Sequence, residues 1–209
     1  MMKKISIFIA GTFVGLQADN LHYAKHAAHT VQESRQVQDK VFNAYSTAEV
    51  VPLDVARDTK AVLDLFRTNM YWLCADPHCT AEQLLRYVVQ LSKSHSIDQL
   101  TLKVLRHQGQ LAGFIAYQRE SADQGKILLL AVPEQARGKG HGMVLIQHAF
   151  DALTQQGVKD IVLDTSVDNV TAQRLYQRAG FKNLGVHPDF EKHLRFSYKV
   201  PVVKAVVFA

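Results

Sequence analysis

The sequence predicts an α/β (α+β) domain in which helices flank a single mixed β-sheet. In some stretches the apolar residues alternate or run on for the length of a strand, and in others they recur every three or four residues, as in amphipathic helices. Strand-like and helix-like segments follow one another in the order β, α, α, β, β, β, α, β, α, β. This order of elements is typical of one sheet covered by helices. The 209 residues suffice for one such domain and an extension.

The extension precedes the domain. Lys3 and Lys4 come before an uncharged apolar run from Ile5 to Leu16, which is shorter than the ~20 residues that a membrane-spanning helix needs. Residues 1–18 are therefore either a cleaved signal peptide or an apolar segment buried against the domain. Residues 19–46 contain neither Gly nor Pro and predict an amphipathic helical extension. The domain itself is expected over residues 47–203.

The first part of the domain predicts one strand and two helices. A short strand is expected over residues 48–53 and a helix over 54–69. A second helix should run from Thr80, a good N-cap residue, to about Lys93. The apolar residues of the first helix that we expect to face inward are Ala61, Leu63, Leu65 and Phe66.

Strands dominate the next part. Residues 99–107 alternate between apolar and polar side chains, Gln108 and Gly109 form a turn signal, and residues 111–120 return, which predicts an antiparallel hairpin. Residues 126–132 form a continuous apolar run, as expected for a strand covered on both faces.

The last part of the domain alternates helices with strands. A helix is predicted from near Gly138 to Gln156, and Gly157 ends it. A buried strand over residues 160–167 and a short helix within 169–181 follow. An alternating strand over residues 192–200 completes the expected order.

Charge and metal-ligand spacing exclude some functions. Lys and Arg number 24 and Asp and Glu 19, without a block of like charges, so we expect no nucleic-acid partner. Cys74 and Cys79 lack a second pair of ligands for a structural zinc ion. His22, His26 and His29 would share a helix face, but no carboxylate or cysteine joins them at ligand spacing. We therefore predict no metal site.

The segment "RGKGHG", Arg137 to Gly142, joins a predicted strand to a predicted helix. The free N–H groups and the positive dipole end of a helix start favour a phosphate, and glycines permit its close approach. The segment is not a Walker A loop, because Gly140 follows Lys139 where Ser or Thr is needed. It is not a dinucleotide fingerprint either, because Met143 occupies the place of the third glycine.

Two motifs in this order resemble those of the GCN5-related N-acetyltransferase (GNAT) superfamily. Arg137, Gly140 and Gly142 match its acetyl-CoA pyrophosphate loop, and "NVTAQRLYQRAGF", Asn169 to Phe181, is similar to its later signature. The resemblance covers about residues 48–200. It implies a mixed, mostly antiparallel sheet with helices on both faces, and acetyl-CoA as co-substrate.

The resemblance also implies residue roles. Tyr176 would give a proton to the departing thiolate, and Asn169 would hold the pantetheine arm. Backbone N–H groups of Leu130, Ala131 and Val132 would polarise the carbonyl. The pyrophosphate would be held by the loop, whose residues are Arg137, Gly138, Lys139, Gly140, His141 and Gly142. The general base stays open, with Glu120, Asp164, His107, His141, His187 or a water chain as alternatives.

The resulting expectation is an N-acetyltransferase that acts on a primary amine of a small molecule or peptide by direct attack. The alternative is a non-catalytic acyl-CoA-binding or interaction protein with the same fold. A cytoplasmic location is expected because acetyl-CoA is kept there, unless residues 1–18 are a cleaved export signal. Stable membrane insertion is not expected, and a homodimer is compatible with the sequence.

Overall fold

The computed structural model of the protein describes residues 5–9, 12–16, 48–74, 76–93 and 99–201. Two short strands, β1 (Ile5–Ile9) and β2 (Thr12–Leu16), pair antiparallel in a sheet of their own. The apolar run near the N-terminus thus contains two strands in place of a single element. The helix expected over residues 19–46 lies outside the described residues.

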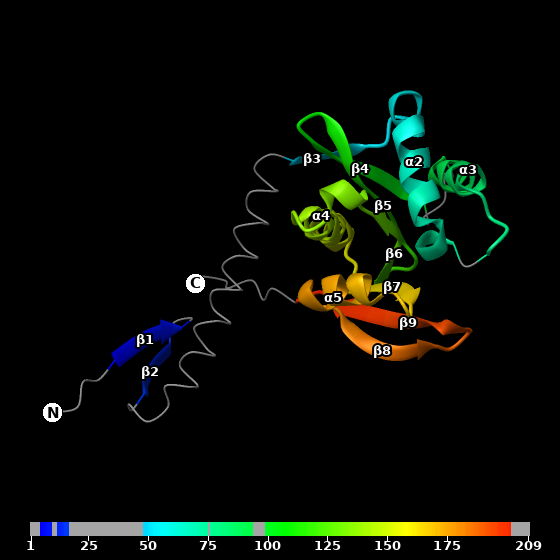
Figure 1. Cartoon of the computed structure of the whole chain (residues 1–209). Coiled ribbons are helices and arrows are strands. Elements are labelled where there is room, and N and C mark those ends of the chain that lie inside the picture. The colour runs from blue at the N-terminus through cyan, green and yellow to red at the C-terminus, as the bar shows by residue number, and fades with distance from the viewer. Residues whose placement is uncertain (1–4, 10–11, 17–47, 75, 94–98, 202–209) are drawn as a thin grey trace, which may run out of the picture.

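A seven-stranded sheet forms the centre of the domain, in the order β3-β4-β5-β6-β7-β9-β8 (Figure 1). Five of its six neighbouring strand pairs are antiparallel, and only β6 and β7 pair parallel. The predicted mixed and mostly antiparallel sheet is confirmed. The strands are β3 (Ala48–Pro52), β4 (Thr101–His107), β5 (Gln110–Arg119), β6 (Gln124–Ala131), β7 (Asp160–Ser166), β8 (Lys182–His187) and β9 (Phe190–Lys199).

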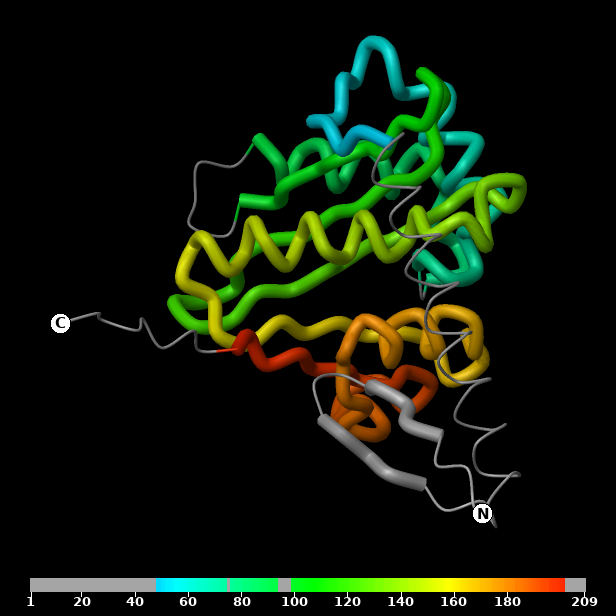
Figure 2. Tube along the Cα trace, turned by 90° about the vertical axis from the view of Figure 1, so that its left-hand side faces the viewer, coloured from blue at the N-terminus to red at the C-terminus, as the bar shows by residue number. Residues whose placement is uncertain are grey.

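Helices cover both faces of the sheet. On one face, α2 (Val55–Leu73) and α3 (Ala81–Ser92) pack against β4, β5 and β6. On the other, α4 (His141–Gln155) lies across β5 and β6, and α5 (Val170–Arg178) covers β7 and β9 (Figure 2). Among the described residues, no helix combines the length and the apolar character that crossing a membrane requires.

The central strand β5 explains why both faces are covered. Phe114 and Ala116 belong to the core under α2 and α3, whereas Ile115 and Tyr117 belong to the core under α4. Successive side chains of a strand point to opposite faces, so a continuous apolar run fills two cores at once. Each large aliphatic side chain that is fully buried there contributes about 1.5–3 kcal/mol.

Close packing fixes α4 over the sheet. A Cβ atom at Gly113 of β5 would lie 2.7 Å from the side chain of Leu145, and one at Gly125 of β6 would lie 2.9 Å from Leu153. Both leucines are completely buried. The absence of side chains at these two glycines therefore lets the helix approach the strands, and it places the start of α4 beside the end of β6.

Capping side chains determine where α2 and α3 begin. The side chain of Asp54 accepts hydrogen bonds from the N–H groups of Ala56 and Arg57. Thr80 and Gln83 form a reciprocal capping box at the start of α3. These caps satisfy N–H groups that a helix start leaves without partners, as the sequence predicted for Thr80.

Three predictions about elements are wrong. The strand β8 was not expected, because it has no apolar alternation and contains Gly185 at a φ of 95°. The helix α4 begins at His141 and not near Gly138, because Gly138 and Gly140 have φ values of 73° and 87° and belong to the loop. Ala61 is exposed, and Val62 is buried in its place.

Candidate functional site

The parallel strands β6 and β7 pair over only three positions and then separate. Their last paired residues are Lys126 and Val162, although both strands continue for several residues. At the same point β6 contains a bulge: Tyr117 pairs with Ile127 and Ala116 with Leu129, so Leu128 has no opposite residue. A bulge bends its strand and increases the local twist. The sheet therefore opens as a fork between β6 and β7, visible as the gap between its upper and lower halves in Figure 1.

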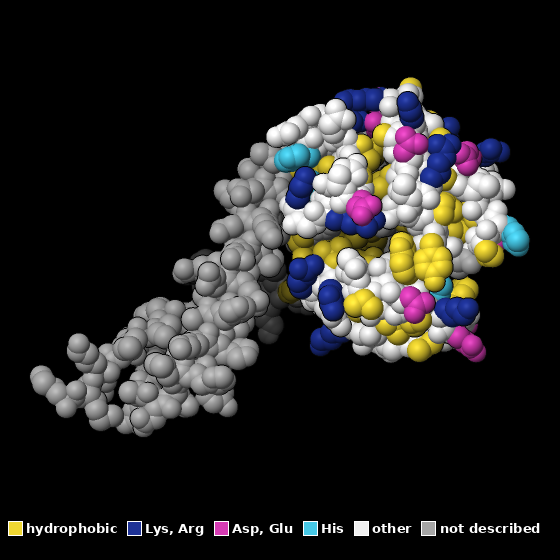
Figure 3. Space-filling view, viewed as in Figure 1, with side chains coloured by type: hydrophobic (Ala, Val, Ile, Leu, Met, Phe, Trp, Pro, Cys, Tyr) yellow, Lys and Arg dark blue, Asp and Glu magenta, His cyan; other side chains and the backbone are white. Residues whose placement is uncertain are grey.

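A cavity of about 620 Å³ occupies this fork. Figure 3 shows hydrophobic side chains along the cleft between the two halves of the domain. The cavity brings together most residues that the sequence predicted for the site, and Lys139 is the exception, since it lies outside the lining. Those that line it are Leu130, Ala131, Val132, Arg137, Gly138, Gly140, His141, Gly142, Asn169 and Tyr176.

The loop at the open end of the fork presents unpaired amides. A short 3-10 turn, Glu134–Ala136, follows β6, and Gly138 and Gly140 then take left-handed backbone angles. Among the described residues, no acceptor takes the N–H groups of residues 138–142, while those of Met143 and Val144 bond to the carbonyl of Gly140. Free amides at a helix start, together with the helix dipole, are a binding site for an anion such as a phosphate.

Two hydrogen bonds hold the side chain of Arg137 beside this loop. Its Nη2 donates to Oδ1 of Asn69 at 2.9 Å, and its Nε donates to the carbonyl of Val132 at 3.2 Å. Asn69 is buried on α2, where its amide also donates to the carbonyl of Leu65. The arginine thus connects the end of β6 with α2, while Lys139 is an exposed side chain nearby.

Asn69→Ala should weaken CoA binding about fivefold, because the loss of one hydrogen bond to a charged group costs about 1 kcal/mol or more. Arg137 would keep its bond to Val132 but lose its connection to α2, so the loop would be less ordered. Calorimetric titration with CoA measures the effect. Thr59→Ala is the control, because the Thr59 hydroxyl lies on the same helix, donates to the carbonyl of Val55 and does not line the cavity. Equal affinities in the two variants would contradict this role of Asn69.

Asn169 is the N-cap of α5. Its Oδ1 accepts the N–H of Ala172 at 3.1 Å. Among the described residues, no acceptor takes its side-chain NH₂ group, and the residue lines the cavity. The cap therefore fixes the orientation of the side chain and leaves two donors for a ligand.

Tyr176 lies two turns further along α5 and also lines the cavity. Its side chain is 7% exposed and contacts the rings of Phe181 and Phe196, with centroids 5.9 and 5.8 Å away. Burial raises the pKa of its phenol to about 12, because the charged form loses its hydration. The phenol is therefore protonated at any working pH.

Comparison with known proteins assigns the family. The model of the "Acetyltransferase (GNAT) family" matches residues 60–181, more than half of the chain. The chain belongs to the GNAT acetyltransferase family. The resemblance seen in the two sequence motifs is thus confirmed.

Similar curated proteins have different acetyltransferase names. The chain is 40% identical over 58 residues to N-alpha-acetyltransferase 30 of Schizosaccharomyces pombe, a match that covers 28% of this chain and 39% of that protein. It is 35% identical over 69 residues to mycothiol acetyltransferase of Beutenbergia cavernae, covering 33% of this chain and 23% of that protein. These matches span well under two thirds of the relatives' own length.

Solved structures share the fold over most of the domain. The spermidine N-acetyltransferase of Vibrio cholerae, crystallised with CoA and spermine, superposes with a TM-score of 0.61 at 19% identity, covering 74% of this chain and 96% of that one. The PaiA N-acetyltransferase of Thermoplasma acidophilum, crystallised with coenzyme A, gives a TM-score of 0.60 at 18% identity, covering 74% and 99%. The expected GNAT fold class is confirmed.

The candidates for a general base lie in different places in this GNAT fold. Asp164 and His141 line the cavity, whereas Glu120, His107 and His187 do not. Burial and the neighbouring His107 lower the pKa of His141, whose ring is 2% exposed and lies 5.1 Å from that of His107. This ring is a packed side chain under the loop.

His187 and Asp164 are both engaged in polar contacts. Nδ1 of His187 accepts the N–H of Asp189 at 3.0 Å, and its Nε2 contacts Nη2 of Arg195. Asp164 receives Nε of Arg195 at 2.9 Å and Nζ of Lys126 at 3.2 Å. Burial alone would raise the pKa of Asp164, but these hydrogen bonds and charges outweigh it and hold that pKa below its ordinary value.

Sequence reasoning missed the contribution of α2 to the site. Asn69, Trp72 and Leu73 of α2 line the cavity, and no motif marks them. In the described part of the chain, no group of three or more metal-ligating side chains is placed to hold a metal ion. Cys74 and Cys79 are free thiols, and the three histidines near the N-terminus lie outside the described residues.

Proposed function

We propose that the protein is an N-acetyltransferase that transfers the acetyl group of acetyl-CoA to a primary amine by direct attack. Its main support is the cavity in the fork between β6 and β7, which joins the unpaired amides of residues 138–142 to Asn169 and Tyr176. An anion site at one end and a phenol along one wall suit a long thioester with a pyrophosphate group.

In this proposal the N–H groups of the glycine loop bind the pyrophosphate, and Arg137 and Lys139 add positive charge beside it. The pantetheine arm lies between the separated strands and hydrogen-bonds to the amide of Asn169. Backbone N–H groups within Leu130–Val132 polarise the thioester carbonyl, since β6 no longer shares its hydrogen bonds with β7 there.

The reaction requires one new bond and one broken bond. The neutral amine nitrogen attacks the carbonyl carbon, and the carbon–sulfur bond then breaks. The departing thiolate takes the proton of Tyr176, and the nitrogen loses its extra proton to water or to a base at the cavity. Asp164 is the carboxylate among the candidates that lines this cavity.

The acceptor is proposed as a primary amine of a small molecule or a peptide, which approaches past Trp72 at the end of α2. Trp72 is 43% exposed and forms an edge-to-face pair with the exposed ring of Tyr71. The names of the relatives refer to N-alpha acetylation, mycothiol, streptothricin and spermidine, so they leave the acceptor class broad. A homodimer is compatible with this proposal.

The purified protein should bind CoA and release free thiol from acetyl-CoA when an amine acceptor is supplied. A panel that includes polyamines, peptides with free N-termini, lysine and aminoglycosides tests the activity by thiol detection. Binding of CoA without thiol release over the whole panel would instead support a non-catalytic acyl-CoA-binding protein. Failure to bind CoA would contradict both.

We propose a cytoplasmic location, because the co-substrate is made and kept there. The competing expectation is export after cleavage near residue 18. N-terminal sequencing of protein from its native host distinguishes them: a mature chain that begins near Asp19 would contradict the cytoplasmic proposal.

A further inference from the structure

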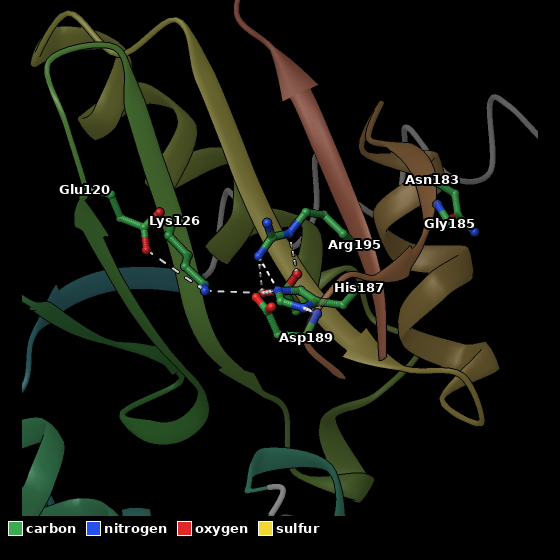
Figure 4. A network of polar contacts seen from close by, with 8 residues as sticks. Glu120, Lys126, Asn183, Gly185, His187, Asp189 and Arg195 are labelled. Atoms are coloured by element: carbon green, nitrogen blue, oxygen red, sulfur yellow. Dashed lines mark hydrogen bonds and ion pairs between the residues drawn. The ribbon is translucent and has the colours of Figure 1, made fainter. Parts of the chain in front are cut away.

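Four charged or polar side chains from four neighbouring strands meet where the fork begins. They are Lys126 of β6, Asp164 of β7, His187 of β8 and Arg195 of β9. Figure 4 shows Lys126, His187 and Arg195 pointing toward one another from their strands, with Glu120 on the other side of Lys126. Asp164 lines the cavity and is a candidate base, whereas Lys126 and Arg195 have no role in the site as described above.

Asp164 is the centre of the network. Arg195 is its direct partner in the antiparallel register and binds both carboxylate oxygens, at 2.9 and 3.3 Å. Nζ of Lys126 approaches Oδ2 at 3.2 Å, and Nε2 of His187 lies 3.7 Å from the same oxygen. The carboxylate side chain is 16% exposed and that of Lys126 is 26% exposed, so the solvent screens this pair less than a surface pair.

The position of the Lys126–Asp164 ion pair is unusual within the sheet. Lys126 pairs with Val162 in the last rung that joins β6 to β7, and Asp164 is two residues further along β7. In the same register Asp164 would face Leu128, the bulged residue. The ion pair thus lies just beyond the last paired position of β6 and β7, where the two strands no longer share backbone hydrogen bonds. It connects two strands that have no backbone pairing beyond this point.

The ion pair also lies at the inner end of the cavity, next to the paired part of β6 and β7. Leu128 on β6 and Asp164 on β7 are the lining residues closest to the paired part of the strands, while the glycine loop lies at the outer end. A CoA molecule whose pyrophosphate sits on the loop must extend inward along β6. Its acyl end therefore points toward Leu128 and Asp164.

We propose that the Lys126–Asp164 pair acts as a clamp that holds the inner end of the fork narrow and so restricts the cavity to short acyl groups. This inference rests on the proposed acyl-CoA site. Lys126 is a positioning residue in this role, because it does not line the cavity and acts through Asp164.

Lys126→Met tests the clamp without leaving a buried charge alone. Asp164 would keep its two bonds to Arg195, and the β7–β9 pairing would be unchanged. The dissociation constants of CoA, acetyl-CoA and butyryl-CoA are measured by calorimetry, which needs no acceptor. We expect the parent to prefer acetyl-CoA over butyryl-CoA and the variant to reduce that preference about fivefold, the effect of about 1 kcal/mol. The affinity for CoA itself should not change.

Two further variants separate a clamp from a general structural effect. Lys126→Arg can still reach Asp164 and should restore the preference of the parent. Lys199→Met removes an ion pair at 2.8 Å between Lys199 and Asp160, which also joins β9 to β7 but lies where β6 and β7 are still paired, so it should leave the preference unchanged.

The outcomes distinguish this inference from the function on which it rests. If the parent binds none of the three CoA compounds, the acyl-CoA site itself is refuted. If the parent binds them and Lys126→Met shows the same acyl preference as the parent, the clamp is refuted and the acyl-CoA site stands. An equal change in Lys199→Met would also refute the clamp.

Discussion

Gly140→Glu should abolish measurable CoA binding, with an expected loss of about 100-fold in affinity. The added carboxylate would stand beside the proposed pyrophosphate site, where like charges cost about 3 kcal/mol. It would also occupy the space through which the phosphates approach the loop. Gly140 is a better position than Gly142, because a Cβ at Gly142 would lie 2.9 Å from the side chain of Leu175 and would disturb packing as well.

Backbone strain requires a matched control. Gly140 has a φ of 87°, and a residue with a side chain pays about 1–2 kcal/mol in that conformation. Gly157→Glu introduces the same carboxylate just beyond the other end of α4, at a φ of 83° and in open space. Both variants should lose similar stability in thermal unfolding, and only Gly140→Glu should lose CoA. Unchanged CoA affinity in Gly140→Glu would rule out the pyrophosphate site.

Some helix starts and ends were predictable from the sequence, because they depend on residues only a few positions apart. Thr80 and Asp54 cap helices through side chains a few residues away, and Gly157 ends α4 with a positive φ. The strand β8 was not predictable, because its burial pattern is almost entirely exposed and its place at the sheet edge depends on pairing with β9. A strand that is stabilised mainly by pairing with a distant strand need not show an apolar alternation in its own sequence.

The site shows the same division between local and long-range features. The glycine loop and the cap at Asn169 follow from short motifs, because both are built within a few residues of the chain. The tie between Arg137 and Asn69 joins residues 68 positions apart, and the network around Asp164 collects four strands. The bulge at Leu128, which separates β6 from β7, lies inside an uninterrupted apolar run. Such features depend on topology and cannot be recognised from spacing.

Tyr176→Phe should reduce kcat about 100-fold or more if the phenol protonates the departing thiolate, which is the usual range for a general acid. The pKa of Tyr176 is raised to about 12 by burial, whereas an ordinary thiol has a pKa of about 8.5. Complete transfer between groups with these values would be uphill by about 5 kcal/mol. The reference thiol is hydrated, however, and burial in the same cavity raises the pKa of a thiol too, so the difference within the cavity is smaller.

The raised pKa of Tyr176 also predicts how kcat depends on pH. Tyr176 must be protonated to donate, and it stays protonated as pH rises toward 12, so it should produce no alkaline loss of kcat below about pH 11. Tyr198→Phe is the control: its ring contacts the same Phe181 and stacks on Phe150, but it does not line the cavity. Both variants should bind CoA like the parent, and only Tyr176→Phe should lose kcat. An unchanged kcat at saturating acetyl-CoA would exclude Tyr176 as the acid, because no other tyrosine lines the described cavity.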